Sequence, residues 1–297
     1  MKIVTYNIHY AIGEDNKYDL ERVIDEIAGA DVIALQEVER FYGPPDQPSQ
    51  PEDIGGLLPE YYWVYDAAFD VDGSESLADG TVINRRRQHG QMLLSRWPII
   101  SKRYYPLPRI NIEDAFNMQM GVIEGVLETP AGRLRIYNVH FGSVSDEERQ
   151  RQAKFVLDMV RNAPLEGGAW TGPASTDIDR DWSCGMDQPP MPANAVVLGD
   201  FNMLPDSPEY ALFANAVAPN KQRLLADIWL AKNPGQTVNT WQPNPGQEGA
   251  RESARLDYCF MTRELCDRVK SSWVDKSARG SDHQPLWVEL SPSQAAG

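Results

Sequence analysis

A short apolar run that stops at an acid and an amide constrains the fold of this chain more than any other feature. The run is 196–198, and Gly199, Asp200 and Asn202 follow it. Such a run predicts a buried strand whose end carries two oxygen-bearing side chains to one rim of a sheet, because residues two apart share a face. Asp200 and Asn202 can therefore hold a hard cation, orient a water molecule, or close a turn by bonding their own backbone.

Apolar runs of this kind alternate with amphipathic segments along the chain. Extended segments are expected at 2–6, 31–36, 91–94, 122–128, 133–139, 196–198, 256–261 and 286–290. Helices are expected at 20–28, 145–161, 207–215 and 222–232. Ser145 and Glu148 match a capping box, and Gly132 separates two extended runs as in a hairpin. Interleaved strands and helices with a hairpin predict a mixed-sheet α/β (α+β) protein.

No linker divides the 297 residues, so we expect a single domain over 1–297. The segment 163–194 is rich in Gly, Pro, Ser and Asp, and a loop this long inside a compact domain is usually functional or disordered. Because the segment follows a helix and precedes a strand, it is expected to reach that strand from the end opposite Asp200. We therefore expect an excursion away from the site and not a lid.

The net charge of -15 restricts the classes of partner. A protein that neutralises nucleic-acid phosphates usually has a basic face, so the acidic balance disfavours nucleic acid without excluding it. The cluster 85–87, three arginines, predicts either a solvated loop or a clamp for a phosphate group. The three cysteines form no CxxC pair, and no signal peptide or membrane-spanning run is visible, so a cytoplasmic location is expected.

Six strand ends, or the turns after them, carry carboxylate, amide or imidazole groups. Each has a structural alternative, such as a turn cap for Asn7 or a salt bridge to Arg255 for Asp257, but a folded sheet places neighbouring strand ends side by side. Asp257 is also the candidate carboxylate that keeps His283 charged. The groups are Asn7 with His9, Glu37, Asn138 with His140, Asp200 with Asn202, Asp257, and Asp282 with His283.

This inventory matches the requirements of phosphoester hydrolysis, which needs an oriented water and donors that stabilise charge on the phosphate. Oxygen ligands without thiolates suit Mg²⁺, with Mn²⁺ as the alternative, so Glu37 is predicted to be a metal ligand. Asp200 and Asn202 are predicted to orient the water. His140 and His283 are predicted to contact the phosphate.

In this order the motifs resemble those of the endonuclease/exonuclease/phosphatase superfamily, which includes pancreatic deoxyribonuclease, abasic-site endonucleases, neutral sphingomyelinases, inositol-polyphosphate 5-phosphatases and mRNA deadenylases. The matching segments are Tyr6-Asn7, Leu35-Gln36-Glu37-Val38, Asn138-Val139-His140-Phe141, Gly199-Asp200-Phe201-Asn202, Leu256-Asp257-Tyr258 and Ser281-Asp282-His283-Gln284-Pro285. The resemblance covers nearly the whole chain. It implies a four-layer α/β sandwich, two packed mixed β-sheets flanked by helices, with the site at its top.

The resemblance also implies a role for each matching residue. The metal would be held by Glu37 with Asn7 beside it and Asp282 as a second carboxylate, water would be aligned by Asp200 with Asn202, and Asp257 with His283 would form a charge-stabilising dyad. A histidine at the position of His140 disfavours abasic-site repair, because abasic-site endonucleases generally lack it. In the deoxyribonuclease branch a glutamate supports this histidine, and Glu75 is considered as its counterpart.

Substrate choice is expected to depend on the loops 41–60, 103–118 and 239–255, which leave the predicted catalytic rim. Aromatic residues there can stack on bases, rest on a lipid surface, or form the local core of long loops. Arg87, His89 and Trp241 are the candidate substrate-binding residues. For His9 and His89 we expect surface roles or roles in substrate loops.

We expect a Mg²⁺-dependent hydrolase that cleaves a phosphodiester or phosphomonoester of a small molecule or lipid headgroup by in-line attack of water. A nuclease similar to deoxyribonuclease is the alternative. A catalytically inert binding module with this fold is disfavoured, because the whole set of polar strand ends is intact.

Overall fold

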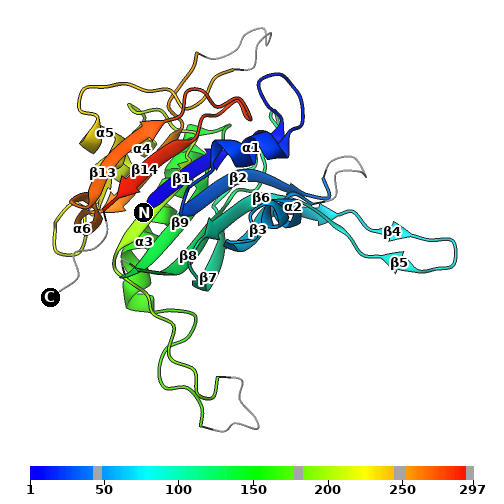
Figure 1. Cartoon of the computed structure of the whole chain (residues 1–297), viewed down its shortest axis with the longest axis horizontal. Helices are drawn as coiled ribbons and strands as arrows, with labels where there is room; N and C mark the ends of the chain where they lie inside the picture. The colour runs from blue at the N-terminus through cyan, green and yellow to red at the C-terminus, as the bar shows by residue number, and fades with distance from the viewer. Residues whose placement is uncertain (43–48, 131, 177–182, 244–251, 292–297) are drawn as a thin grey trace.

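Two six-stranded sheets pack face to face in the computed structural model, which describes residues 1–42, 49–130, 132–176, 183–243 and 252–291 (Figure 1). The first sheet has the order β13 (Val269–Val274), β14 (Leu286–Leu290), β1 (Lys2–Asn7), β2 (Val32–Arg40), β6 (Arg86–Ser95) and β3 (Tyr62–Asp72). The second has the order β11 (Leu225–Asp227), β12 (Asp257–Thr262), β10 (Ala195–Asp200), β9 (Gly132–His140), β8 (Gly121–Thr129) and β7 (Ile99–Pro106). Both sheets mix parallel and antiparallel pairs.

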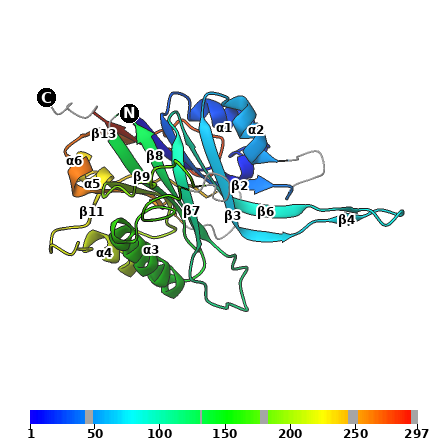
Figure 2. The same ribbon diagram turned by 90° about the horizontal axis from the view of Figure 1, so that it is seen from below.

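Helices cover the outer faces of both sheets (Figure 2). The first sheet is covered by α1 (Leu20–Glu26) and α2 (Gln50–Leu57), and the second by α3 (Asp146–Glu166) and α4 (Pro208–Ala214). The short helices α5 (Ile228–Lys232) and α6 (Arg263–Cys266) follow β11 and β12. The fold is therefore the four-layer α/β sandwich expected from the sequence.

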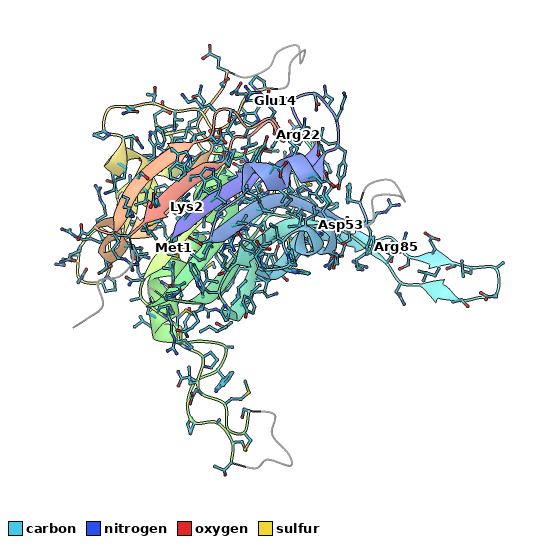
Figure 3. The ribbon with its side chains drawn as sticks, viewed as in Figure 1. Met1, Lys2, Glu14, Arg22, Asp53 and Arg85 are labelled. Carbon is cyan, nitrogen blue, oxygen red and sulfur yellow. The ribbon has the colours of Figure 1, made fainter. Side chains whose placement is uncertain are left out.

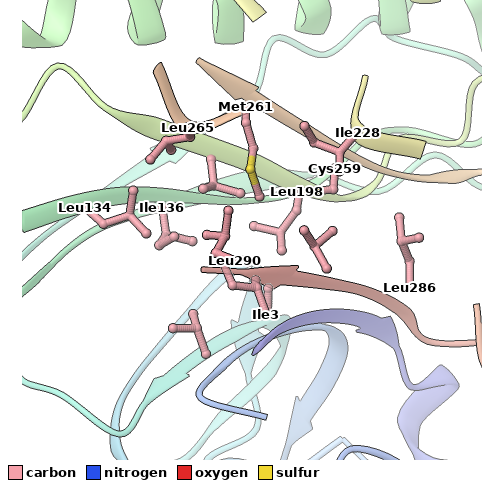
Figure 4. Close-up of a cluster of buried hydrophobic side chains, with 14 of the residues drawn as sticks. Ile3, Leu134, Ile136, Leu198, Ile228, Cys259, Met261, Leu265, Leu286 and Leu290 are labelled. Atoms are coloured by element: carbon pink, nitrogen blue, oxygen red, sulfur yellow. The ribbon is translucent and has the colours of Figure 1, made fainter. Parts of the chain in front are cut away.

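The core lies between the sheets, where apolar side chains of both meet (Figure 4). Ile3 of β1, Leu93 of β6, Ile136 of β9 and Leu198 of β10 are buried there. Since successive strand residues point to opposite faces, the other residues of these strands pack under the helices. The central strands are thus apolar on both faces over most of their length, and polar groups concentrate toward their ends.

Parallel pairing brings several of these ends to one edge of the sandwich. β1 runs parallel to β2, which sets Asn7 beside Gln36, and β9 runs parallel to β10, which sets His140 beside Asp200. Asp200 is also paired with Asp257, at the start of the antiparallel β12. Because β1 packs against β10 across the core, the polar ends of the two sheets face each other.

The segment between α3 and β10 leaves the sandwich at the other end. The expected helix start is confirmed, because the Ser145 hydroxyl accepts a bond from the Glu148 backbone N–H at 3.3 Å. The helix continues to Glu166, so the expected loop 163–194 was wrong in its first residues, 163–166, which are helical. As α3 links two parallel strands, the described parts of 167–194 extend away from the polar strand ends (Figure 1).

Other expected elements also differ from the structure. The helix expected at 222–232 begins only at Ile228, because Leu225–Asp227 pair with the edge of β12 as β11. The expected loop 41–60 contains α2. Between β3 and β6, the strands β4 (Glu75–Ser76) and β5 (Val82–Ile83) form an arm that projects from the sandwich (Figure 1). None of the helices in the described ranges is both long and apolar enough to cross a membrane.

Candidate active site

A β-bulge in β2 turns Glu37 toward the polar strand ends. The pairing of β2 with β6 shifts register between Gln36 and Val38, and Glu37 adopts a φ of 57°. A bulge leaves one residue unpaired and re-aims its side chain. Asn7 Nδ2 donates to Glu37 Oε1 and to Asp200 Oδ2, both at 3.0 Å. This one amide therefore joins carboxylates that belong to different sheets.

Close packing of β9 against β10 explains the glycine before Asp200. Gly199 has a φ of 144°, and a Cβ atom there would lie 1.9 Å from the Val139 carbonyl oxygen. The buried Asp200 carboxylate accepts bonds from the Asn202 backbone N–H at 2.8 Å and from Asn202 Nδ2 at 3.2 Å. Burial raises the pKa of Asp200 to about 7, although the nearby His283 charge opposes this shift. Asp200 and Asn202 thus form one rigid unit.

His283 and Asp257 form a buried imidazole–carboxylate pair. His283 Nδ1 lies 2.8 Å from Asp257 Oδ2, and its Nε2 faces Asp200 Oδ2 at 3.7 Å. Burial lowers the pKa of His283, but Asp257 and Asp200 outweigh burial and raise this pKa to about 10. The imidazole is therefore cationic at neutral pH, and it presents Nε2–H toward Asp200.

His140 and His89 lie together on the other side of this cluster. His140 Nε2 is 3.6 Å from Asp200 Oδ2 and 3.8 Å from Glu37 Oε1, and the two imidazole centroids are 6.3 Å apart. Burial lowers the pKa of His140 to about 4. Burial also opposes ionisation of Glu37, but His89, His140, the hydrogen bond from Asn7 and His9 together outweigh it and keep the Glu37 pKa below its usual value. His89 is only 7% exposed, so of the two roles expected for it, at the surface or in a substrate loop, the surface role is wrong.

Asp282 forms part of the rim with an indole and an imidazole as neighbours. Trp241 Nε1 donates to Asp282 Oδ2 at 3.0 Å, and His9 Nδ1 faces Asp282 Oδ1 at 3.7 Å. Trp241 also forms an isolated β-bridge with His283. These contacts hold Asp282 beside the imidazole–carboxylate pair.

A buried polar network lies beneath the site, between the sheets, and sequence analysis did not identify it as a unit. Its members are Thr5, Gln36, Gln91 and Asn138. Asn138 Nδ2 donates to the carbonyl oxygens of Leu35 (2.9 Å) and Met92 (3.0 Å). Gln36 Nε2 donates to Asn138 Oδ1 at 2.6 Å, and Gln91 Nε2 to the Asn138 carbonyl at 2.9 Å. Polar residues at inward positions of otherwise apolar strands are the signal that could have found it.

A cavity of about 1320 Å³ opens over these strand ends. Of the predicted site residues, those that line it are Glu37, His140, Asp200, Asn202, Trp241, Asp282 and His283, with Asn7 and Asp257 buried behind them. Apolar side chains, including Met118, Met120 and Leu204, line another part. Arg149 is the one lysine or arginine among the described lining residues, and it is bound to Glu209 (2.9 Å) and Asp146.

The projecting arm keeps other predicted residues away from this cavity. Arg85 lies where the arm leaves the sandwich and faces Glu75 at 3.4 Å (Figure 3). Arg86 pairs with an aspartate of β3 at 2.7 Å. Arg87 is exposed and is absent from the described residues that line the cavity. The structure therefore brings neither Arg87 to the cavity as a clamp nor Glu75 to the buried histidine as its support.

The sequence matches the endonuclease/exonuclease/phosphatase family over residues 4–169 and 185–283. The chain belongs to this family. A family protein from Beutenbergia cavernae has a similar structure, with 21% identity and a TM-score of 0.66 over 99% of this chain and 72% of that one. A Neisseria 3' phosphatase bound to product DNA hairpin is 18% identical, with a TM-score of 0.59 over 98% and 99% of the two chains. A mannosyl-6-phosphatase from Bacteroides thetaiotaomicron is 17% identical, with a TM-score of 0.59 over 98% and 99%. No curated protein matches the chain.

Endonuclease/exonuclease/phosphatase proteins are hydrolases that act on phosphoesters, and they are generally metal-dependent. The donors in this cavity fit such a metal. Glu37 and Asp282 supply carboxylate oxygens at the cavity wall, and Asn7 holds Glu37 in place. Carboxylates with open positions for water and phosphate are the ligands that Mg²⁺ prefers.

Proposed function

We infer that this chain is a Mg²⁺-dependent hydrolase that cleaves a phosphoester of a small molecule or lipid headgroup by in-line attack of water. The observation that carries the inference is the position of Asp200. Its carboxylate lies within 3.6 Å and 3.7 Å of two imidazoles and is held by Asn7 at 3.0 Å. A fixed acceptor beside two phosphate-binding groups suits a water that must be aligned with a leaving oxygen.

In this reaction Asp200, fixed by Asn202, orients the attacking water. His283, kept cationic by Asp257, donates to the phosphate and stabilises the charge that develops on it. His140 contacts the phosphate from the other side. Glu37, with Asn7 beside it, and Asp282 would hold Mg²⁺, which when bound polarises the phosphate oxygens. Mn²⁺ has a similar preference for carboxylate ligands and is the alternative metal.

The charges of the cavity support a small substrate. A nucleic acid presents many phosphates and is usually met by several lysines and arginines. Here the single arginine of the described lining is already paired with Glu209 and Asp146, whereas Glu37 and Asp282 add negative charge. Met118, Met120 and Leu204 offer apolar surface to the alcohol part of an ester. One phosphate on a partly apolar alcohol fits this lining better than a polyanion.

The test is hydrolysis by the purified full chain with Mg²⁺ and then with EDTA. The substrates are a chromogenic phosphodiester, a chromogenic phosphomonoester, sphingomyelin and plasmid DNA. Asp200→Asn and His283→Gln are expected to lower kcat by at least about 100-fold, because each removes a group used in the transition state. Asp25→Asn, an exposed change on α1, is the matched control and should behave as wild type.

Three results would overturn the proposal or its substrate class. Hydrolysis that survives EDTA would exclude a metal-dependent reaction. Equal rates in wild type and Asp200→Asn would exclude Asp200 as the group that orients the water. A clear preference for plasmid DNA over the small esters would replace the proposed substrate class with the nuclease alternative.

A further inference from the structure

We propose that Glu37, His89 and His140 form a binding site for a transition-metal ion such as Zn²⁺ or Co²⁺, distinct in its ligands from the oxygen-based Mg²⁺ site. One ligand atom from each of the three residues lies within 4.8 Å of the other two. The inference shares Glu37 with the proposed Mg²⁺ site but needs neither Asp282 nor Asn7. Two imidazoles and one carboxylate are a ligand set typical of zinc hydrolases and of non-haem iron sites.

The position of His89 is the observation that points to a ligand. The side chain is 7% exposed, and its Nε2 atom is buried without any hydrogen-bond partner. A buried imidazole nitrogen left without a partner loses the hydrogen bond that water would give it, so such an atom calls for an explanation. A metal ion at the cavity wall would satisfy it.

The other nitrogen of His89, Nδ1, faces a carboxylate, as the second nitrogen of a metal-binding histidine usually does. His89 Nδ1 faces Glu39 Oε1 at 3.6 Å, and Glu39 is the residue paired with His89 across β2 and β6. Metal-binding histidines usually direct one nitrogen to a carboxylate, which fixes the tautomer and leaves the other lone pair for the metal. Glu39 is thus the positioning residue for His89.

The three ligands come from elements that are fixed independently. Glu37 projects from the bulge of β2, His140 ends β9, and His89 lies on β6 within the strand pairing of β2 and β3. His140 Nε2 and Glu37 Oε1 are already 3.8 Å apart, and two ligands of one tetrahedral Zn²⁺ are separated by about 3.4 Å. A shift of about an ångström, mainly in His89, would complete the site.

The inference is tested by adding Co²⁺ and Zn²⁺ to the metal-free full chain. Co²⁺ bound by two imidazoles should give visible absorption bands and, in the NMR spectrum of wild type, shifted signals from two imidazole N–H groups. Zn²⁺ binding measured by calorimetry should weaken by at least about 100-fold in His89→Ala and about 10-fold in Glu39→Gln. Mg²⁺ binding should change little in both variants, because Mg²⁺ prefers oxygen ligands.

His9→Asn is the control, since His9 lies at the same cavity outside the three-residue set. It should bind Co²⁺ and Zn²⁺ as wild type does. The proposal fails if wild type gives no shifted imidazole signals, or if folded Glu39→Gln and His89→Ala bind Zn²⁺ like wild type. Those outcomes leave Mg²⁺-dependent hydrolysis untouched. Conversely, the protein could give a His89-dependent Co²⁺ spectrum and yet hydrolyse none of the esters. That result would refute the proposed function but support the metal site.

Discussion

Asn138, two residues before His140 on β9, should contribute strongly to the stability of the sandwich. The side chain is fully buried, and it makes three hydrogen bonds, to the carbonyls of Leu35 and Met92 and from Gln36 Nε2. The strands of Leu35, Gln36 and Met92 belong to the first sheet, whereas Asn138 belongs to the second. Asn138→Ala therefore removes three bonds that join the two sheets.

The expected loss follows from these bonds. A buried hydrogen bond contributes about 0.5–1.5 kcal/mol net, so three of them amount to about 1.5–4.5 kcal/mol, and the buried Gln36 amide that loses its acceptor adds a desolvation cost. Alanine restores no apolar contact, and the space it leaves adds to the cost. We expect the free energy of unfolding to fall by about 3–5 kcal/mol in urea denaturation followed by tryptophan fluorescence.

Asn215→Ala is the matched control. Asn215 is exposed at the end of α4 and makes one bond within the helix end, to the Ala211 carbonyl at 2.9 Å. Its replacement should cost at most about 0.5 kcal/mol. A loss below about 1 kcal/mol in Asn138→Ala would mean that water or neighbouring groups replace the network, and would refute a role of Asn138 in joining the sheets.

Three further predictions concern the site and the distal segment. Gly199→Ala would bring Cβ to 1.9 Å from the Val139 carbonyl oxygen, so we expect a loss of about 2–4 kcal/mol in urea unfolding; unchanged stability would show that β9 and β10 separate easily. Glu37→Gln should raise the Mg²⁺ concentration for half-maximal hydrolysis by about tenfold or more, and an unchanged requirement in a Mg²⁺ titration would exclude Glu37 as ligand. Replacing 170–188 by a short Gly-Ser turn should alter kcat/KM by less than about twofold, because Gly168 already lies against Pro189; a large loss would place this segment in the site.

The sequence was sufficient to predict those elements that depend on local chemistry or on the burial of both faces of a strand. Ser145 caps α3 through its own hydroxyl, and Gly132, with a φ of 99°, turns β8 into β9 as the hairpin pattern predicts. The strand that ends in Asp200 could be found because its apolar run is buried on both faces. The 222–232 segment was mispredicted because β11 forms only by pairing with β12, a contact between distant residues that local helical spacing does not encode.

The burial of His89 could not be predicted for the same reason. The residues before it, 85–88, are polar and at least partly exposed, which favours a loop, and nothing local indicates that β6 continues this far. The residue is buried because β2 and β3 pair on either side of it. Glu37 was predicted from its type and position, but its orientation depends on a bulge that a one-residue register shift creates. Residue types at strand ends were therefore predictable, whereas their packing depended on long-range pairing.

The environments of His140 and His283 show why this distinction matters for chemistry. Both are buried imidazoles beside Asp200, at 3.6 Å and 3.7 Å. Only His283 also has a carboxylate at hydrogen-bond distance, Asp257 at 2.8 Å. Against the effect of burial, Asp257 and Asp200 together raise the pKa of His283 to about 10, whereas burial lowers that of His140 to about 4. At neutral pH His283 is therefore a cation with an N–H on both ring nitrogens, whereas His140 is neutral and has one N–H and one lone pair. Under the proposed function, a phosphate between the two rings would meet a charged donor at His283 and a neutral ring at His140. This asymmetry follows from Asp257, which bonds His283 and has no counterpart at hydrogen-bond distance from His140 among the described residues.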